Sequence, residues 1–445
     1  MVDAQSGDSS DRHRPRAERW SRNELSRMRG MADPEVDQVV EGYYRKHPEL
    51  GDSRSLVRSM IRELSQAKQE PQRFMHDAAD HDNTWLTAAL NVAHASPRWN
   101  IEPRLMKRGQ DVFANYGLYQ ASALFFASLP MAYASVDGAA VLARVSDLAT
   151  HNLTRRVAET GQMLLDVMAL RGDRGLEPGT TGYATAIGLR LMHACVRVLI
   201  LDQRGPDQWP TEEYGSPVNQ ELLLATLLDF TIVAWEAMAR MGVRLDEGDR
   251  EANLHVWSFI GMLMGVEACR DGPLTLGDAE LISSGLTRLL GPSEGGLRLM
   301  RALLDEMEEF MPLGWRKLPR SVVRWLFQDA PGLVSRLPEL LQVPPAPWWS
   351  APLLASLRAA NQDSWFLGPV APLARRLIRK LGREVIIGYS DRYSNGQAPF
   401  RFPDELASRW GIRATPVGRG VRRIRRSVRN SVRRRFKRAQ SLGSS

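Results

Sequence analysis

Apolar positions recur at helical spacing along most of the chain, and this pattern predicts a predominantly α-helical protein. Hydrophobic side chains return every three or four residues over residues 84–95, 139–170, 183–201, 220–241 and 251–264. The segment 183–201 is apolar on nearly every face, which is typical of a helix that is buried on all sides. We therefore expect an all-α fold in which this helix lies in the core.

Two segments depart from the simple helical pattern. Residues 384–389 (EVIIGY) are the only good strand candidate. Residues 121–143 are apolar enough to suggest a membrane span, but they contain Pro130, Asp137 and Gly138. We interpret this second segment as two buried helical pieces with a break near Pro130.

The helix over residues 220–241 carries start and stop signals. Asn219 precedes it and is a good N-cap residue, and Glu221 lies in the first turn, where the helix dipole favours a negative charge. Gly242 follows the last apolar position, as a C-terminal capping glycine does. These residues predict both ends of the helix.

The pattern divides the chain into four parts. Residues 1–30 are polar and charged, and we expect a disordered extension because they bury too little apolar surface. Residues 31–320 form the predicted helical domain, and residues 321–416 a mostly helical C-terminal extension. Residues 417–445 form a separate basic tail.

The charge of the chain is concentrated in this tail. The net charge is +8, and eleven basic residues without an acidic one lie between positions 419 and 438, so the rest of the chain is mildly acidic. Apolar residues spaced by three or four positions place one hydrophobic stripe on a basic helix: Val417, Val421, Ile424, Val428, Val432 and Phe436. Such a helix favours attachment of residues 417–438 to a membrane surface, with nucleic acid or another protein as alternative partners.

Composition and missing motifs exclude several classes of protein. Cys195 and Cys269 are the only cysteines and neither lies in a CxxC motif, which excludes a zinc ribbon and a disulfide scaffold. The sequence has no glycine-rich phosphate loop, which excludes the Rossmann and P-loop classes. Residues 1–20 lack the apolar core of an export signal. We expect a cytoplasmic protein, peripheral at the inner face of the membrane if its tail binds lipid.

An unusual stripe of charge runs along the apolar segment 183–201. Arg190, His193 and Arg197 are spaced by three and four residues and so share one helix face. Buried arginines need anionic partners. A dicarboxylate cofactor with a metal, such as haem, would satisfy both arginines and ligate the histidine. The alternative, which spacing alone favours, is that protein carboxylates pair the arginines and His193 is a satisfied core histidine.

A second polar group lies on the preceding predicted helix. Arg156, Glu159 and Thr160 are spaced by three and four residues and share a face of an otherwise apolar helix. Together they would line a polar pocket. The alternative is an intrahelical pair between Arg156 and Glu159, with the Thr160 hydroxyl bonded to a backbone carbonyl.

These groups, in this order, resemble the MpaB-like oxygenase family (DUF2236), which includes the latex-clearing proteins. The resemblance covers roughly residues 100–310. It is carried by four pieces: Arg155-Arg156-Val-Ala-Glu-Thr160, Arg190-Leu-Met-His193-Ala-Cys-Val-Arg197, Gly215-Ser-Pro-Val-Asn-Gln220 with Thr226 and Phe230, and Leu254-His-Val-Trp257-Ser-Phe-Ile-Gly261-Met-Leu-Met-Gly265.

The resemblance implies an all-α, globin-like core that binds one b-type haem. His193 matches the axial ligand of the iron, and Arg190 and Arg197 match arginines beside it. Arg156 and Thr160 match the polar group of the distal pocket. The implied activity is an oxygenase reaction between dioxygen and a lipophilic substrate of isoprenoid or alkene type. The alternative is a non-catalytic haem-binding or helical interaction protein that docks through its tail.

Two positions depart from the latex-clearing pattern. Glu159 stands where those proteins have a lysine that can ligate the iron from the second side. Their catalytic acidic residue has no clear counterpart upstream of Arg156, where Asp137 and Asp147 are the nearest candidates. Latex-clearing proteins are secreted, so without an export signal we expect a small lipophilic alkene and not rubber as the substrate.

Overall fold

The computed structural model describes residues 15–46, 91–93, 99, 101–145, 153–169, 176–177, 179–203, 208–311, 313–328 and 334–362. Contacts divide the chain into residues 1–401 and 402–445, and all the described residues belong to the first unit. The predicted strand at 384–389 and the basic tail lie outside the described residues. The binding of the tail to membrane or nucleic acid stays a prediction.

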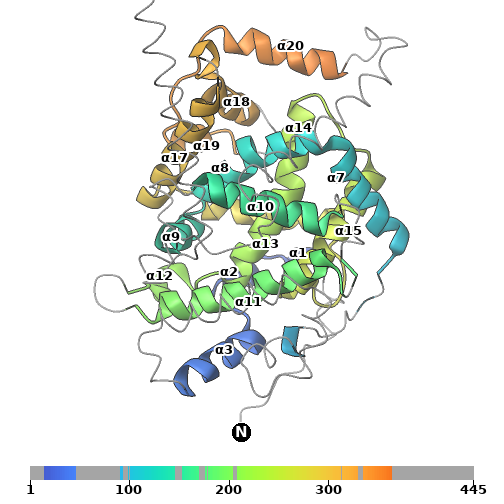
Figure 1. The fold of residues 1–445 in the computed structure, drawn as a ribbon, viewed down its shortest axis with the longest axis vertical. Coiled ribbons are helices and arrows are strands. Elements are labelled where there is room, and N and C mark those ends of the chain that lie inside the picture. Colours follow the sequence, from blue (N-terminus) through green and yellow to red (C-terminus); the bar gives the residue numbers. More distant parts are fainter. Residues whose placement is uncertain are drawn as a thin grey trace, which may run out of the picture. The chain divides into compact units, whose positions relative to one another are not determined.

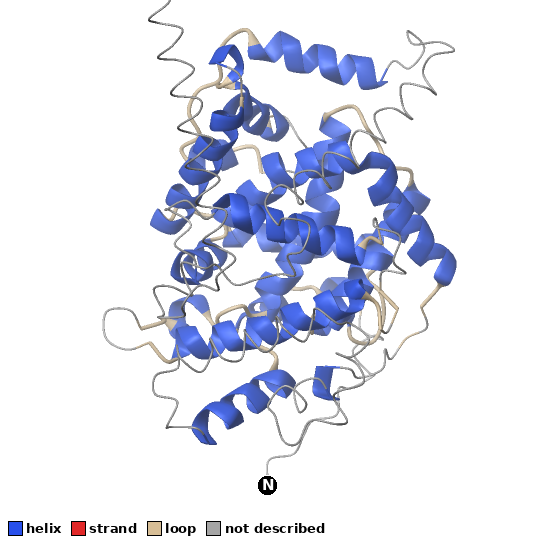
Figure 2. Cartoon of the chain, in the orientation of Figure 1, coloured by secondary structure: helices blue, strands red, loops and turns tan. Residues whose placement is uncertain are grey.

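The described part of the chain is built from helices joined by short loops, and it contains no strand (Figure 2). The predicted all-α fold is therefore confirmed. The α-helices are α1 (Arg16–Arg19), α2 (Arg22–Arg29), α3 (Pro34–Lys46), α7 (Pro103–Ala123), α8 (Leu129–Ala134), α9 (Val136–Val145), α10 (Leu153–Val167), α11 (Thr181–Leu201), α12 (Thr211–Tyr214), α13 (Gln220–Leu228), α14 (Ala234–Arg240), α15 (Glu247–Leu263), α16 (Leu276–Leu286), α17 (Glu294–Phe310), α18 (Leu318–Phe327), α19 (Leu337–Leu340) and α20 (Ser350–Gln362). Two π-helices, η3 (Leu124–Ser128) and η5 (Asp229–Val233), and three 3₁₀ turns, η6 (Glu267–Cys269), η7 (Thr287–Leu289) and η8 (Leu313–Trp315), complete the list.

Helices α7 and α15 form the closest helix pair of the core. Helix α15 is buried without interruption from Ala252 to Gly261. Its backbone approaches α7 at Gly109, where a Cβ atom would lie 2.3 Å from the Ala252 carbonyl oxygen. Only glycine permits this approach, so this one position sets the spacing between the two helices.

Helix α11 is buried over most of its length, as its all-round apolar pattern predicts. The Thr180 hydroxyl caps its start by accepting a hydrogen bond from the Tyr183 amide. Figure 1 shows α11 between α10 on one side and α3 on the other, and it packs against both and against α15. The helix therefore presents its Arg190–His193–Arg197 stripe inside the protein.

The segment 121–143 is helical and interrupted, but the interruption is not at the predicted place. The chain breaks at Ser135, whose backbone is extended (ψ 113°) between α8 and α9. Pro130 instead is the second residue of α8, two positions after the last residue of the π-helix η3. Proline removes a backbone hydrogen bond and crowds the preceding turn, and the wider π-turn accommodates it without a break.

The expectation of disorder for residues 1–30 is wrong for residues 16–29, which form α1 and α2. Ser21 caps α2, and Leu25 and Met28 are both buried against the helical domain. The Arg29 guanidinium donates to the Asp137 carboxylate, with 2.7 Å between Nε and Oδ2. Few buried apolar residues are enough to order this segment because ion pairs and the Ser21 cap of α2 also stabilise it.

The predicted ends of the helix at 220–241 are confirmed. The Asn219 side chain accepts from the Leu222 amide at 2.9 Å, and Gly242 has a φ of +89° directly after the helix. Glu221 lies in the first turn, is fully buried and is paired with Arg288. Between its two ends the helix runs as α13, η5 and α14, with the π-helix in the middle.

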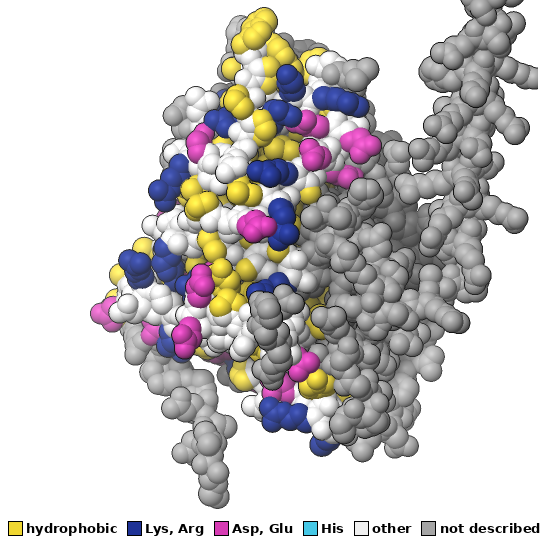
Figure 3. Space-filling view, turned by 90° about the vertical axis from the view of Figure 1, so that its left-hand side faces the viewer, with side chains coloured by type: hydrophobic (Ala, Val, Ile, Leu, Met, Phe, Trp, Pro, Cys, Tyr) yellow, Lys and Arg dark blue, Asp and Glu magenta, His cyan; other side chains and the backbone are white. Residues whose placement is uncertain are grey.

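Two helices, Thr181–Leu201 and Gln220–Arg240, are long and apolar enough to cross a membrane by composition. Both are elements of the helical core, and most of the first is buried within the chain. Of the predicted C-terminal extension, residues 321–328 and 334–362 are described, and they are largely helical. On the face shown in Figure 3, the described surface mixes basic, acidic and hydrophobic side chains.

Candidate active site

The two arginines of α11 are buried, and both are bound to carboxylates from the chain's own N-terminal region. Arg190 is 7% exposed and makes a two-pronged contact with Asp33, at 2.5 Å (Nε to Oδ2) and 2.8 Å (Nη2 to Oδ1). Its Nη2 also lies 3.3 Å from Glu35 Oε2. Burial opposes the charge of Arg190, but the hydrogen bonds and charge of Asp33 outweigh it and raise the pKa of the guanidinium.

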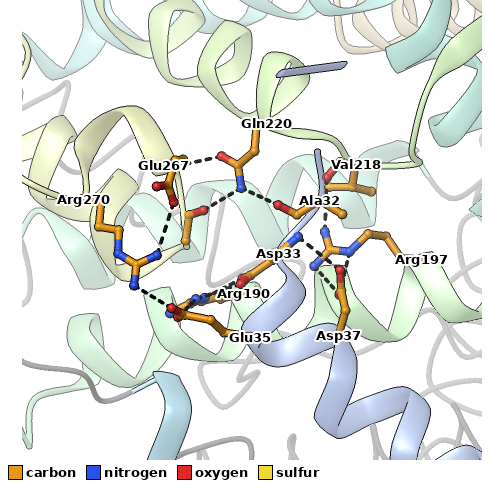
Figure 4. A network of polar contacts seen from close by, with 11 residues as sticks. Ala32, Asp33, Glu35, Asp37, Arg190, Arg197, Val218, Gln220, Glu267 and Arg270 are labelled. Atoms are coloured by element: carbon orange, nitrogen blue, oxygen red, sulfur yellow. Dashed lines mark hydrogen bonds and ion pairs between the residues drawn. The ribbon is translucent and has the colours of Figure 1, made fainter. Parts of the chain in front are cut away.

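Arg197 is bound in the same way, two turns further along α11. It is 2% exposed; its Nε donates to Asp37 Oδ1 at 2.8 Å and its Nη1 to the Val218 carbonyl at 3.1 Å. Burial raises the pKa of Asp37, and the charge and hydrogen bond of Arg197 only partly offset this rise. Asp33, directly before α3, and Asp37, in the first turn of α3, thus each supply a carboxylate to one of the two arginines (Figure 4).

Backbone and amide groups close the network around these pairs. The Gln220 amide donates to the Ala32 carbonyl at 2.7 Å and to the Gly265 carbonyl at 2.9 Å, and it accepts from the Glu267 amide at 2.8 Å. Gly265 has a φ of +79°, and a Cβ atom there would lie 2.5 Å from Asp33 Oδ2. Gly265 is therefore required both by its backbone conformation and by the close approach of Asp33.

This geometry corrects one expectation about the cofactor. Arg190 and Arg197 were predicted to bind the carboxylates of a cofactor, but protein carboxylates already bind both, which is the alternative that spacing alone favours. The acidic residues Asp33, Glu35 and Asp37 were missed. Their signal is present in the sequence as Asp-Pro-Glu-Val-Asp at a helix start, a natural source of counter-charge for two buried arginines.

His193 differs from the arginines on either side of it. Its Nδ1 atom is buried and has no hydrogen-bond partner, while the residue keeps part of its surface accessible. Burial, reinforced by the nearby charge of Arg197 and opposed by Asp33, lowers the pKa of the imidazole to about 3. The ring is therefore neutral at physiological pH, and a neutral imidazole carries the lone pair that a metal ion needs.

The surroundings of His193 fit a metal that brings its own further ligands. No cluster of three or more His, Cys, Asp or Glu side chains able to hold a metal is found in the described residues. A buried histidine with an unsatisfied nitrogen and no companion ligands suits a metal held in an organic macrocycle such as haem. His193 thus fits the predicted axial ligand, whereas Arg190 and Arg197 do not fit as carboxylate binders.

The second predicted polar group lies on α10, which packs against α11. The helix over Leu153–Val167 confirms that residues 156, 159 and 160 share a face. Thr160 is exposed, and the side chains of Arg156 and Glu159 lie outside the described part of the chain. The catalytic role of these three residues stays a prediction. Of the two acidic candidates, Asp137 is paired with Arg29, and Asp147 lies outside the described residues.

A further polar residue, Asp229, was missed by the sequence reasoning. It opens η5, deep among the surrounding protein, and burial alone raises the pKa of its carboxyl well above its usual range. The signal was one acid in the middle of the apolar run Leu222–Trp235. The next residue, Phe230, stacks on Trp257 of α15 with ring centres 4.3 Å apart and ring planes 13° apart.

Comparison with known proteins agrees with the resemblance seen in the sequence. Residues 109–433 match the family described as the catalytic domain of ER-bound oxygenase mpaB/B′ and rubber oxygenase. The chain belongs to this family. A rubber oxygenase from Streptomyces sp. (strain K30) is 30% identical over 113 residues, which cover 25% of this chain and 26% of that protein.

The likeness to this family extends to the fold. A latex clearing protein solved in its closed state superposes with a TM-score of 0.60 at 18% identity, over 81% of this chain and 91% of that chain. The chain therefore has the all-helical fold of the family. The curated rubber oxygenase is matched over about a quarter of its length, so its substrate is not transferred to this chain.

Proposed function

We propose that this protein is a haem b-dependent oxygenase that uses dioxygen to oxidise a lipophilic substrate of isoprenoid or alkene type. The observation that supports the proposal most directly is His193. In a chain of an oxygenase family, it offers a buried, neutral imidazole with an unpartnered nitrogen. Burial of this kind has a cost that a structural histidine would avoid by hydrogen bonding.

Haem, when bound, would supply the redox chemistry by which dioxygen is activated. The chain's own part is to hold and orient that group. His193 would hold the metal of this group, and the low pKa keeps one ring nitrogen free of a proton at neutral pH. The Arg190–Asp33 and Arg197–Asp37 pairs lock the face of α11 on which His193 lies, three and four residues away.

The residues around this helix favour a lipophilic substrate. Helices α11, α13 and α15 bring mostly aliphatic and aromatic side chains together, and Phe230 and Trp257 form one rigid aromatic contact among them. An apolar site with few polar groups binds an apolar molecule and excludes water from it. Arg156, Glu159 and Thr160 on the neighbouring helix α10 would supply the polar groups of this site.

The proposal is tested by the haem content of His193→Ala beside a matched control. The control is His255→Ala, since His255 is also buried, lies on α15, and is supported by the Glu102 amide and the Trp99 ring. In cells supplied with haem, wild type and His255→Ala should bind about one haem per chain and show a Soret band. His193→Ala should lose most of the haem while its circular dichroism stays helical.

The outcomes separate the parts of the proposal. A folded wild type without haem would reject the cofactor, and equal haem in His193→Ala and His255→Ala would reject the ligand. Dioxygen uptake with a panel of terpenes and terpenoids then tests turnover. A haem-loaded protein that consumes no dioxygen with any of them would favour the haem-binding alternative.

A further inference from the structure

One side of the segment α13–η5 keeps accessible surface. The residues with accessible surface there are Ala225, Thr226, Asp229, Phe230 and Ile232, and Thr226 is exposed. Successive spacings of one, three, one and two residues place them along one side of the helix. Asp229 is nevertheless deep among the surrounding protein. A deep side chain with accessible surface borders an internal space, so this stripe forms a wall of such a space.

The wall is held rigidly at Asp229. The Ser128 hydroxyl of η3 donates to the Asp229 carbonyl at 2.6 Å, which ties the two π-helices η3 and η5 together. Stacking on Trp257 fixes Phe230 on the other side. Single π-turns inside long helices are frequent at functional sites, because they re-aim one side chain away from the regular helix face. Here the side chain at the start of the π-turn is the carboxyl of Asp229.

This carboxyl has no hydrogen bond or ion pair to any described residue, and its only strong influence is burial. Burial without a counter-charge raises the pKa of this carboxyl and so favours its neutral, protonated form. A neutral carboxylic acid has one O–H donor and a carbonyl acceptor. Leaving both groups without a hydrogen-bond partner in an apolar surrounding is energetically unfavourable.

We propose that Asp229 is the polar recognition group of the substrate pocket and binds a single oxygen-bearing group, a hydroxyl or a carbonyl, of an otherwise hydrocarbon substrate. The proposal rests on the oxygenase function proposed above and narrows its substrate class to oxygenated isoprenoids. A ligand with such a group forms one or two hydrogen bonds with the carboxyl. A pure hydrocarbon of the same size leaves it unpartnered, and a site of this kind discriminates against such analogues.

The test compares the binding of farnesol and β-farnesene, an alcohol and a hydrocarbon of similar carbon skeleton, to the haem-loaded full chain. Dissociation constants are measured by tryptophan fluorescence, for which Trp257 beside Phe230 is a local reporter, and by equilibrium dialysis. Variants are Asp229→Leu, which removes the hydrogen-bonding group, and Asp229→Asn, which keeps a donor and an acceptor. The control is Asp111→Leu, an exposed acid on the surface of α7. Haem content is measured for every sample.

Wild type, Asp229→Asn and Asp111→Leu are expected to bind farnesol at least about tenfold more tightly than β-farnesene, whereas Asp229→Leu should lose this preference by binding farnesol less and β-farnesene more tightly. Equal affinities of wild type for the two ligands, or an unchanged preference in Asp229→Leu, would overturn the inference. If all samples contain haem but none prefers farnesol to β-farnesene, this inference is wrong and the proposed function is unaffected. Absence of haem from a folded wild type defeats the proposed function instead.

Discussion

Two parts of the core differ in whether their buried polar groups have partners. Below α11, every buried charge is matched: Arg190 has Asp33, and Arg197 has Asp37. The buried Nδ1 atom of His193 has no hydrogen-bond partner, and the Asp229 carboxyl has no hydrogen bond or ion pair to a described residue. Buried polar groups are normally paired, so the exceptions need a reason. The paired residues stabilise the fold, whereas His193 and Asp229 are the positions at which we propose that a cofactor and a substrate bind.

The largest effect is expected from breaking the paired region. Arg190→Leu leaves Asp33 buried without its counter-charge and should lower the free energy of unfolding by about 3–5 kcal/mol. The control is Arg320→Leu: Arg320 makes the same two-pronged contact with Glu308, at 2.6 Å for each pair of atoms, but nearer the surface. It should cost about 1 kcal/mol. Urea unfolding measures both. Equal losses would mean that burial does not set the strength of these pairs.

A smaller effect concerns pH and the N-terminal helices. Asp278 accepts from Trp20 Nε1 at 2.7 Å and from Arg19 Nη2 at 3.0 Å, and it forms a capping box with Thr275. Burial raises its pKa, but the hydrogen bonds from Thr275 and Trp20 and the charge of Arg19 outweigh burial and lower it.

The sign of the pH effect follows from that lowered pKa. The unfolded carboxyl has a pKa of about 3.9, so the stabilisation by Asp278 is complete above that value and is lost as the pH falls through the lower folded pKa. Asp278→Asn should lower the free energy of unfolding by about 1–2 kcal/mol at pH 7 and make it fall less steeply below pH 4. Parallel pH profiles for wild type and variant would contradict the assignment.

The smallest effect should have the opposite sign. Asp229→Leu removes a buried group that has no partner, so stability should stay constant or rise by about 1 kcal/mol. Thermal unfolding of the ligand-free variant checks this. A loss of more than 2 kcal/mol would show that Asp229 is a structural residue with a partner in the folded chain, and the contrast between the two regions would disappear.

The fold and part of the site could be predicted from the sequence, because both rest on local patterns. Helical spacing predicted α11 and its burial, and Asn219 and Gly242 marked the ends of the helix at 220–241. The shared face of Arg190, His193 and Arg197 is also a local property. The local pattern was less reliable at Pro130. A π-turn accommodates this proline, and the helix is interrupted at Ser135 instead.

What the sequence did not show depends on contacts between distant residues. The partners of Arg190 lie 157 and 155 positions away, in Asp33 and Glu35, and spacing along one helix carries no information about them. The helical conformation of residues 16–29 likewise depends on distant partners such as Asp278 and Asp137. Asp229 is visible in the sequence as one acid in an apolar run, but its depth and its lack of a partner are apparent only in the structure.

The docking of the first turn of α3 onto α11 also sets an order of events during synthesis. The carboxylates at positions 33–37 leave the ribosome early, whereas Arg197 follows some 160 residues later and Arg270, which pairs with Glu35, later still. Until those arginines have been synthesised, the carboxylates of Asp33, Glu35 and Asp37 lack their partners. Contacts of such long sequence separation form slowly and leave the nascent chain open to aggregation. Efficient production of this protein should therefore depend on chaperones that protect the chain until residue 270 has emerged.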